Sequence, residues 1–186
     1  MIETERLILR RFTEKDVADA FEYLREPTVH CFECMRVGGM EEAEKAVAER
    51  AKSKEPYFAV ELKESGKVIG EINAISEATA PDEENAPRDT FSPCWMLNPG
   101  YHGRGYAYEA AHAFFDYLFS EKGARRIYAY TEDYNLPSQK LCEKLGMRRE
   151  GLYLEFVSFV KDEKGNPIYE NTYEYAILKK EWEKQN

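Results

Sequence analysis

The chain has 186 residues, of which 43% are hydrophobic and 33% charged, and this composition suits one globular domain, residues 1–186, with a core of its own. It has no apolar run of about 18 residues and no basic-then-apolar N-terminus, so neither a membrane span nor a signal peptide is expected, and the cytoplasm is the default location. The net charge of −9 argues against nucleic-acid binding. It suits a cationic substrate, although acidity also serves solubility alone.

The first half of the chain predicts two helices among strands. A strand is expected within residues 3–12, followed by a helix that Thr13 caps and that ends near Arg25. A second helix, mostly charged, is expected over residues 41–53. Strands over 57–62 and 68–75 flank turn residues and form a hairpin, and the polar stretch 77–90 is a surface loop.

The second half alternates strands and helices before a final hairpin. The order is a strand (91–97), a long helix up to residue 119, a strand (126–131), a helix (136–145) that Gly146 ends, and paired strands (152–160 and 168–178). Because hairpins join most strands, we expect an α+β fold: a mixed, mostly antiparallel sheet with helices on both faces.

The junction between residues 98 and 107 predicts a phosphate site. Gly103 and Gly105 precede a helix whose first amides have no intrahelical acceptor, and glycines let an anion approach those amides. Arg104 adds a cation, and no acidic residue occurs in the helix before Glu109. The alternative is a helix start that merely turns tightly. A dinucleotide fingerprint is excluded by Tyr108, which stands where a third small residue is needed, and the chain has no P-loop motif.

Two blocks of the sequence resemble the GNAT acetyltransferases. The segment Asn98-Pro99-Gly100-Tyr101-His102-Gly103-Arg104-Gly105-Tyr106-Ala107 is similar to their acetyl-CoA pyrophosphate loop, and Asn135-Leu136-Pro137-Ser138 with Lys144-Leu145-Gly146 is similar to their second block. The loop segment is most similar to the branch of ribosomal-protein N-terminal and polyamine acetyltransferases, and the N- and C-terminal segments also match the family. One departure is Gly100, where the family has Gln or Arg.

The resemblance implies a binding mode for acetyl-CoA as co-substrate, without a metal. Strands around Trp95 and Ile127 would splay apart, and the pantetheine arm would lie in the gap. Asn135 would bond that arm, although it could also simply cap the following helix. The expected cofactor-binding residues are Met96, Leu97, Tyr101, His102, Gly103, Arg104, Gly105, Tyr106, Ala107, Asn135 and Ser138.

Acetyl transfer to an amine needs a base, an oxyanion donor and, for the leaving thiolate, an optional acid. Glu71 and Glu77 are the candidate bases, and each would act through a water molecule. Strand alternation puts both side chains on the same side of their strand. The alternative is that this side is polar only because it faces solvent. Cys142 occupies the position where the family often has a tyrosine that acts as the general acid, so its thiol is a candidate acid. The alternative is that Cys142 is buried and packs as a small hydrophobic residue. Ser138 is the other candidate acid.

The pair Cys31 and Cys34 beside His30 has spacing typical of metal or redox sites, but the chain has no second ligand pair.

Taken together, the loop and the resemblance predict an N-acetyltransferase that acts by direct attack of a primary amine, either a protein N-terminal α-amine or a small amine. The alternatives are a non-catalytic CoA-binding sensor or scaffold and a nucleotide-binding protein. No nucleic acid or membrane partner is expected, and the sequence leaves open a homodimer.

Overall fold

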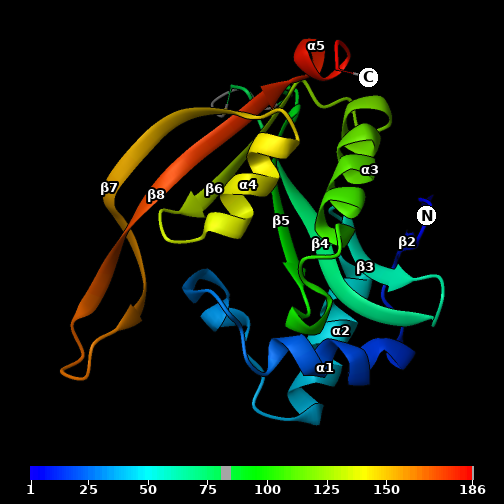
Figure 1. Ribbon diagram of the computed structural model, residues 1–186, viewed down its shortest axis with the longest axis vertical. Helices are drawn as coiled ribbons and strands as arrows, with labels where there is room; N and C mark the ends of the chain where they lie inside the picture. The colour runs from blue at the N-terminus through cyan, green and yellow to red at the C-terminus, as the bar shows by residue number, and fades with distance from the viewer. Residues whose placement is uncertain (81–84, 186) are drawn as a thin grey trace.

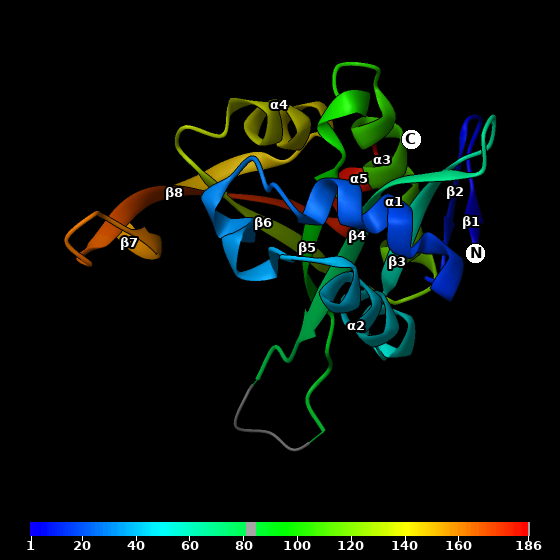
Figure 2. The ribbon, with the colours of Figure 1, turned by 90° about the horizontal axis from the view of Figure 1, so that it is seen from below.

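The structure is a computed structural model that describes residues 1–80 and 85–185. At its centre is an eight-stranded sheet in the order β1-β2-β3-β4-β5-β6-β8-β7, which Figures 1 and 2 show from two directions. The strands are β1 (Ile2–Glu3), β2 (Leu7–Arg10), β3 (Tyr57–Leu62), β4 (Lys67–Glu77), β5 (Thr90–Leu97), β6 (Arg126–Glu132), β7 (Arg148–Lys161) and β8 (Pro167–Leu178).

The helices lie between these strands in the sequence. They are η1 (Glu14–Asp16), α1 (Val17–Leu24), η2 (His30–Met35), α2 (Met40–Lys52), η3 (Pro99–Tyr101), α3 (Tyr106–Ser120), α4 (Leu136–Lys144) and α5 (Lys179–Trp182), where η marks a 3-10 helix. The described helices include none that is long and apolar enough to cross a membrane.

Two hydrophobic cores lie on opposite faces of the sheet. The larger core packs α3 against the sheet around Phe114, Phe115 and Ile127. The smaller core packs α1 and α2 against the other face around Tyr23, Val47 and Ala59. Helices therefore cover both faces, as predicted, with α1 and α2 on the opposite side from α3 and α4 (Figure 2).

The predicted hairpins are confirmed. β3 pairs antiparallel with β4, and β4 pairs antiparallel with β5 along its length, from Gly70 opposite Leu97 to Glu77 opposite Thr90. β7 and β8 form a long terminal hairpin that extends away from the body of the molecule in both views (Figures 1 and 2). The surface loop predicted over residues 77–90 is shorter, because β4 reaches Glu77; residues 81–84 of that loop lie outside the described residues.

Three N-terminal features differ from the prediction. The first strand is two short strands, since the chain turns between Glu3 and Leu7. Thr13 begins the 3-10 turn η1 rather than the α-helix itself, and its amide donates to the carboxylate of Asp16 at 2.7 Å. The stretch expected to be irregular contains η2, which has no buried residue and therefore lacks an apolar period that sequence reading could detect.

β5 and β6 run parallel and pair only at their first residues. Thr90 lies opposite Arg126 and Phe91 opposite Ile127, and the two strands then diverge. β6 pairs instead with β8, from Arg126 to Glu132. The edge of β5 that faces β6 is consequently unpaired from Ser92 to Leu97, and this divergence is the splay that the family resemblance implied.

Candidate active site

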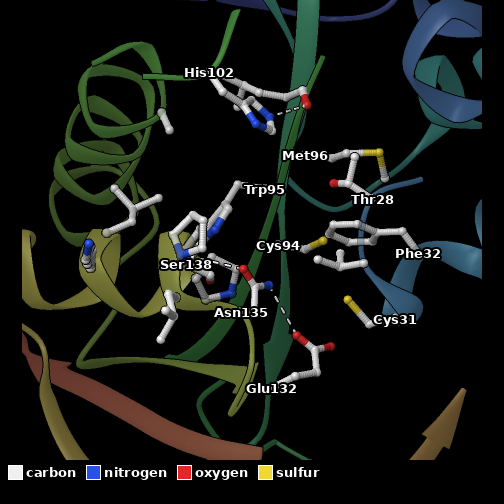
Figure 3. A pocket seen from close by; sticks show the side chains of 18 of the residues that line it. Thr28, Cys31, Phe32, Cys94, Trp95, Met96, His102, Glu132, Asn135 and Ser138 are labelled. Atoms are coloured by element: carbon white, nitrogen blue, oxygen red, sulfur yellow. Dashed lines mark hydrogen bonds between the residues drawn. The ribbon is translucent and has the colours of Figure 1, made fainter. Parts of the chain in front are cut away.

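A cavity of about 690 Å³ opens where β5 and β6 diverge (Figure 3). That volume lies within the range typical of small-molecule and cofactor sites. The cavity has three walls: residues 92–97 of β5; the loop of residues 101–107 with the start of α3; and residues 135–141 at the start of α4. Residues of the η2 segment close the remaining side.

The loop before α3 turns because two glycines adopt left-handed backbone conformations. Gly103 has φ +73° and Gly105, the N-cap of α3, has φ +82°. Side chains rarely adopt these angles, and a Cβ on Gly103 would meet no atom within 4 Å. The amides at the first turn of α3 have no intrahelical acceptor, so the loop presents unpaired donors and the positive end of a helix dipole to the cavity.

The N-terminal segment holds this loop in place. Arg6 donates from Nη1 to the carbonyl of Arg104 at 3.0 Å, and its guanidinium lies over the Tyr106 ring, 4.5 Å from the centroid. It also pairs with Glu109, which in turn accepts from the Thr4 hydroxyl at 2.6 Å. The carboxylate of Glu109, in the first turn of α3, is therefore bonded to the N-terminal segment and not to the first amides of the helix.

The end of β6 and the start of α4 bring three polar side chains to the cavity. Asn135 is the N-cap of α4, and its Oδ1 accepts from the Ser138 amide at 3.3 Å. Its Nδ2 donates to Glu132 Oε2 at 3.2 Å, and both hydrogen bonds are drawn in Figure 3. Asn135 thus has the capping role that the sequence offered as an alternative. Ser138 and Glu132 line the cavity beside it.

The β5 wall alternates its side chains across the sheet. Cys94 and Met96 lie in register with Asn73 and Glu71 of β4 and share the α1–α2 side of the sheet with them. Trp95 and Leu97 project to the α3 side, and the Leu97 carbonyl accepts from His102 Nε2 at 2.9 Å. The cavity therefore reaches both faces of the sheet, which allows one ligand to enter from each side.

Ten of the eleven predicted cofactor-binding residues line this one cavity. The exception is Arg104, whose guanidinium lies over the Tyr101 ring, 5.6 Å from the centroid. Of the predicted catalytic residues, only Ser138 lines the cavity. The residues that do are Met96, Leu97, Tyr101, His102, Gly103, Gly105, Tyr106, Ala107, Asn135 and Ser138.

Glu71 lies instead at the centre of a buried network between β4 and α2. It is 1% exposed and accepts hydrogen bonds from Tyr23 Oη at 3.0 Å and Tyr57 Oη at 2.6 Å. Arg50 Nε donates to the same carboxylate at 2.9 Å. Burial and the Glu71 charge raise the pKa of both tyrosines well above its usual value, so they stay protonated donors.

Glu77 and Cys142 also lie outside the cavity lining. Glu77 ends β4 and accepts from Tyr128 Oη at 2.6 Å. Cys142 is fully buried in the larger core, where burial raises the pKa of its thiol to about 12. The catalytic roles of Glu71, Glu77 and Cys142 stay predictions, and none of these side chains lies among those that line the cavity.

Sequence reasoning missed Glu132 and the η2 wall. Glu132 is the one carboxylate among the residues that line the cavity in the described part of the chain. Its signal was its alternation with Tyr128 and Tyr130, which puts all three on one side of β6. The η2 wall consists of Thr28, Val29, Cys31, Phe32 and Met35. Among the described residues, no group of three His, Cys, Asp or Glu side chains could hold a metal ion.

The chain matches known acetyltransferases over most of its length. Residues 6–148 match the family model described as acetyltransferase (GNAT) domain. YnaD of Bacillus subtilis, an uncharacterized N-acetyltransferase, is 33% identical over 181 residues, which cover 97% of this chain and 98% of the relative.

Solved structures share the fold. An acetyltransferase of the GNAT family from Bacillus anthracis is 32% identical, with a TM-score of 0.81 and coverage of 97% of this chain and 99% of that one. A mutant of the spermidine N-acetyltransferase SpeG from Vibrio cholerae has a TM-score of 0.72 at 19% identity, covering 96% of this chain and 97% of that one. With the splayed strands and the glycine loop, these matches show that the chain belongs to the GNAT acetyltransferases, enzymes that use acetyl-CoA as co-substrate.

Proposed function

We propose that this enzyme transfers the acetyl group of acetyl-CoA to a primary amine by direct attack within the cavity between β5 and β6. The observation that carries the proposal is that one cavity joins an anion-binding loop to an unpaired strand edge and reaches both faces of the sheet. A long thioester could lie along the edge from one face while an amine approaches from the other.

The residues of the cavity fit acetyl-CoA. The amides before and within the first turn of α3, opened by Gly103 and Gly105, would bind its phosphates. The unpaired edge of β5 would hydrogen-bond the amides of the pantetheine arm in the manner of an added strand. The same backbone edge offers donors to the oxyanion that forms during acyl transfer.

Ser138 is the proposed acid for the departing thiolate. Its amide is engaged by Asn135, which fixes the start of α4, and its side chain lines the cavity. A thiol with a pKa near 8.5 leaves well without full protonation. We therefore expect Ser138 to assist the reaction rather than to be indispensable.

The proposed acceptors are a protein N-terminal α-amine, as in the ribosomal-protein branch that the sequence resembles, or a small amine. The spermidine N-acetyltransferase neighbour gives an example of the second class on the same fold. An α-amine, with a pKa near 8, is partly neutral at pH 7, whereas the primary amines of polyamines are mostly protonated.

Calorimetric titration with acetyl-CoA, with ATP as the control ligand, tests the first half of the proposal. We expect binding of acetyl-CoA and none of ATP. Mass spectrometry of a peptide with a free α-amine, spermidine and n-butylamine after incubation with acetyl-CoA tests the second half. A protein that binds acetyl-CoA but acetylates no amine would contradict the proposed function.

A further inference from the structure

Glu132 occupies an unusual position for an acidic side chain. It ends β6 at the floor of the cavity, and it is only 5% exposed (Figure 3). In the described part of the chain, no Lys, Arg or His nitrogen forms an ion pair with its carboxylate. The other two nearly buried glutamates that adjoin this region, Glu71 and Glu170, pair with Arg50 and His30 respectively.

The partners of the Glu132 carboxylate are neutral groups. Oε2 accepts from Asn135 Nδ2 at 3.2 Å, and the Cys31 thiol of η2 lies beside the same carboxylate. Burial, reinforced by Glu132, raises the pKa of Cys31 well above its usual value, so the thiol stays protonated. A buried carboxylate with only neutral donors is poorly compensated, and a cation in the cavity would complete its environment.

Other titratable groups surround this position on each packed element. Glu170 of β8 bonds His30 Nδ1 and also accepts from Tyr134 Oη at 3.3 Å, and Tyr134 interacts electrostatically with both Glu132 and Glu170. From β5, Cys94 lies near Cys31. Glu170 is already paired with His30, whereas the thiols and Tyr134 are neutral. Lys140 of α4 lines the same cavity, but in the described part of the chain it forms no ion pair with Glu132, so this carboxylate is the lining group left to receive a cation.

We propose that Glu132 is a catalytic residue that binds the acceptor amine in its protonated form and removes its proton. This inference rests on the proposed function and defines the acceptor by chemistry: a primary amine that enters as a cation, rather than a hydroxyl or a thiol. It also assigns the role of general base to Glu132, which lines the cavity, in place of Glu71 and Glu77, which lie outside the cavity lining.

The proton balance is as follows. The ammonium group gives one proton to the Glu132 carboxylate, and the freed nitrogen lone pair forms a bond to the thioester carbonyl carbon. When the tetrahedral intermediate collapses, the C–S bond breaks and its electron pair leaves on sulfur. The Ser138 hydroxyl protonates the thiolate to give CoA and regains a proton as the nitrogen loses its second one, and Glu132 releases its proton to solvent. One ammonium and one acetyl-CoA yield one amide, one CoA and one proton.

Glu132→Gln tests the proposal, since glutamine keeps the size of the side chain and an oxygen for Asn135 but cannot take a proton. With whichever amine of the panel the wild type acetylates, we expect kcat/KM at pH 7 to fall about 10²- to 10³-fold. The deficit should shrink as the pH approaches the pKa of the free amine, because a neutral amine needs no base. Glu132→Asp should retain the wild-type shape of the pH profile at a lower rate.

Glu143→Gln is the matched control, because it makes the same carboxylate-to-amide change at an exposed position of α4 outside the cavity lining. Its kcat/KM should stay within about threefold of wild type, and acetyl-CoA should bind both glutamine variants with unchanged affinity. A Glu132→Gln variant with unchanged kcat/KM, or one whose loss is equal at every pH, would overturn the inference while leaving the proposed function intact. A wild type that binds acetyl-CoA but acetylates no amine would overturn both.

Discussion

Arg6 and Glu109 join the first turn of α3 to the N-terminal segment at two points. The backbone amide of Arg6 donates to Glu109 Oε1 at 2.7 Å, and its Nε donates to Oε2 at 2.6 Å. Because Arg6 also bonds the carbonyl of Arg104, between Gly103 and Gly105, the pair holds both the middle of the glycine loop and the start of α3. A residue between β1 and β2 thereby positions the loop that we propose binds the phosphates of acetyl-CoA.

This contact should make stability depend on pH in a predictable direction. Burial raises the pKa of Glu109, but hydrogen bonds from Thr4 and Arg6 outweigh that effect and hold it below its usual value. Since the folded pKa is the lower one, the unfolded chain binds the proton more readily. The contribution of Glu109 is present above the unfolded pKa of about 4.5 and is lost as the pH falls through the folded pKa.

We therefore expect Glu109→Gln to lower the free energy of unfolding by about 1–2 kcal/mol at pH 7, the lower part of the range for hydrogen bonds to a charged group because Arg6 is 41% exposed, and by less at pH 4. Urea unfolding of wild type and variant at both pH values measures the difference in their free energies of unfolding. The other carboxylates are common to both proteins, so their contributions cancel in this difference. Glu121→Gln, at the exposed opposite end of α3, should change stability by less than about 0.5 kcal/mol. A deficit of the same size at both pH values would contradict the argument.

Gly103 and Gly66 provide a matched pair for testing the loop. Both have a left-handed φ, +73° and +70°, and a Cβ on either would meet no atom within 4 Å. Alanine at each position should therefore cost a similar strain energy, about 1–2 kcal/mol. Only Gly103 lines the cavity, because Gly66 lies in the β3–β4 turn.

We expect Gly103→Ala to weaken acetyl-CoA binding about tenfold or more, since its methyl group would occupy the surface to which the phosphates bind, whereas Gly66→Ala should leave the affinity unchanged. Calorimetric titration of both variants, after thermal unfolding has shown similar losses of stability, measures this. Equal affinities in the two variants would remove Gly103 from the phosphate site.

The sequence grouped the candidate cofactor-binding residues far better than the candidate catalytic residues, since ten of eleven line the cavity against one of four. The loop is defined by local signals, because two glycines, a turn and the apolar residues of one helix face occur within about twenty residues. The register of the hairpins likewise follows from their turn residues. The burial of Glu71 depends instead on Arg50, about twenty residues away on a helix that is charged on most sides. Ala43, Val47 and Arg50 do share one buried face, but an arginine in that series does not reveal its partner.

The Glu71–Arg50 pair should contribute strongly to stability. The side chains are 2% and 9% exposed, and Glu71→Gln would leave the Arg50 charge buried without a counter-ion. We expect Glu71→Gln to lower the free energy of unfolding by about 3–5 kcal/mol. The double variant Glu71→Gln with Arg50→Met should lose clearly less than the sum of the two single losses, because it removes both charges together. Urea unfolding of the four proteins completes the cycle, and additive losses would show that the pair is not coupled.

Ser138 and Cys142 lie one turn apart on α4 and should respond in opposite ways to alanine substitution. Ser138 lines the cavity, whereas Cys142 is fully buried against the larger core, and burial raises its thiol pKa to about 12. A thiol so hard to ionise packs as a small hydrophobic group. Ser138→Ala should therefore lower kcat severalfold with little change in stability.

Cys142→Ala should instead cost about 1–2 kcal/mol of stability, because it leaves a small void in the core, and should keep kcat within about twofold when assayed well below its melting temperature. Steady-state kinetics and thermal unfolding of both variants measure the two effects. If the acid were Cys142, the pattern would reverse: kcat would fall in Cys142→Ala and hold in Ser138→Ala. A loss of kcat in both variants would indicate that α4 must be rigid as a unit. Cys142→Ser would then decide, because serine restores a proton donor but not the apolar packing of the thiol. Its stability loss should persist, and its kcat should recover only if a proton donor is needed at that position.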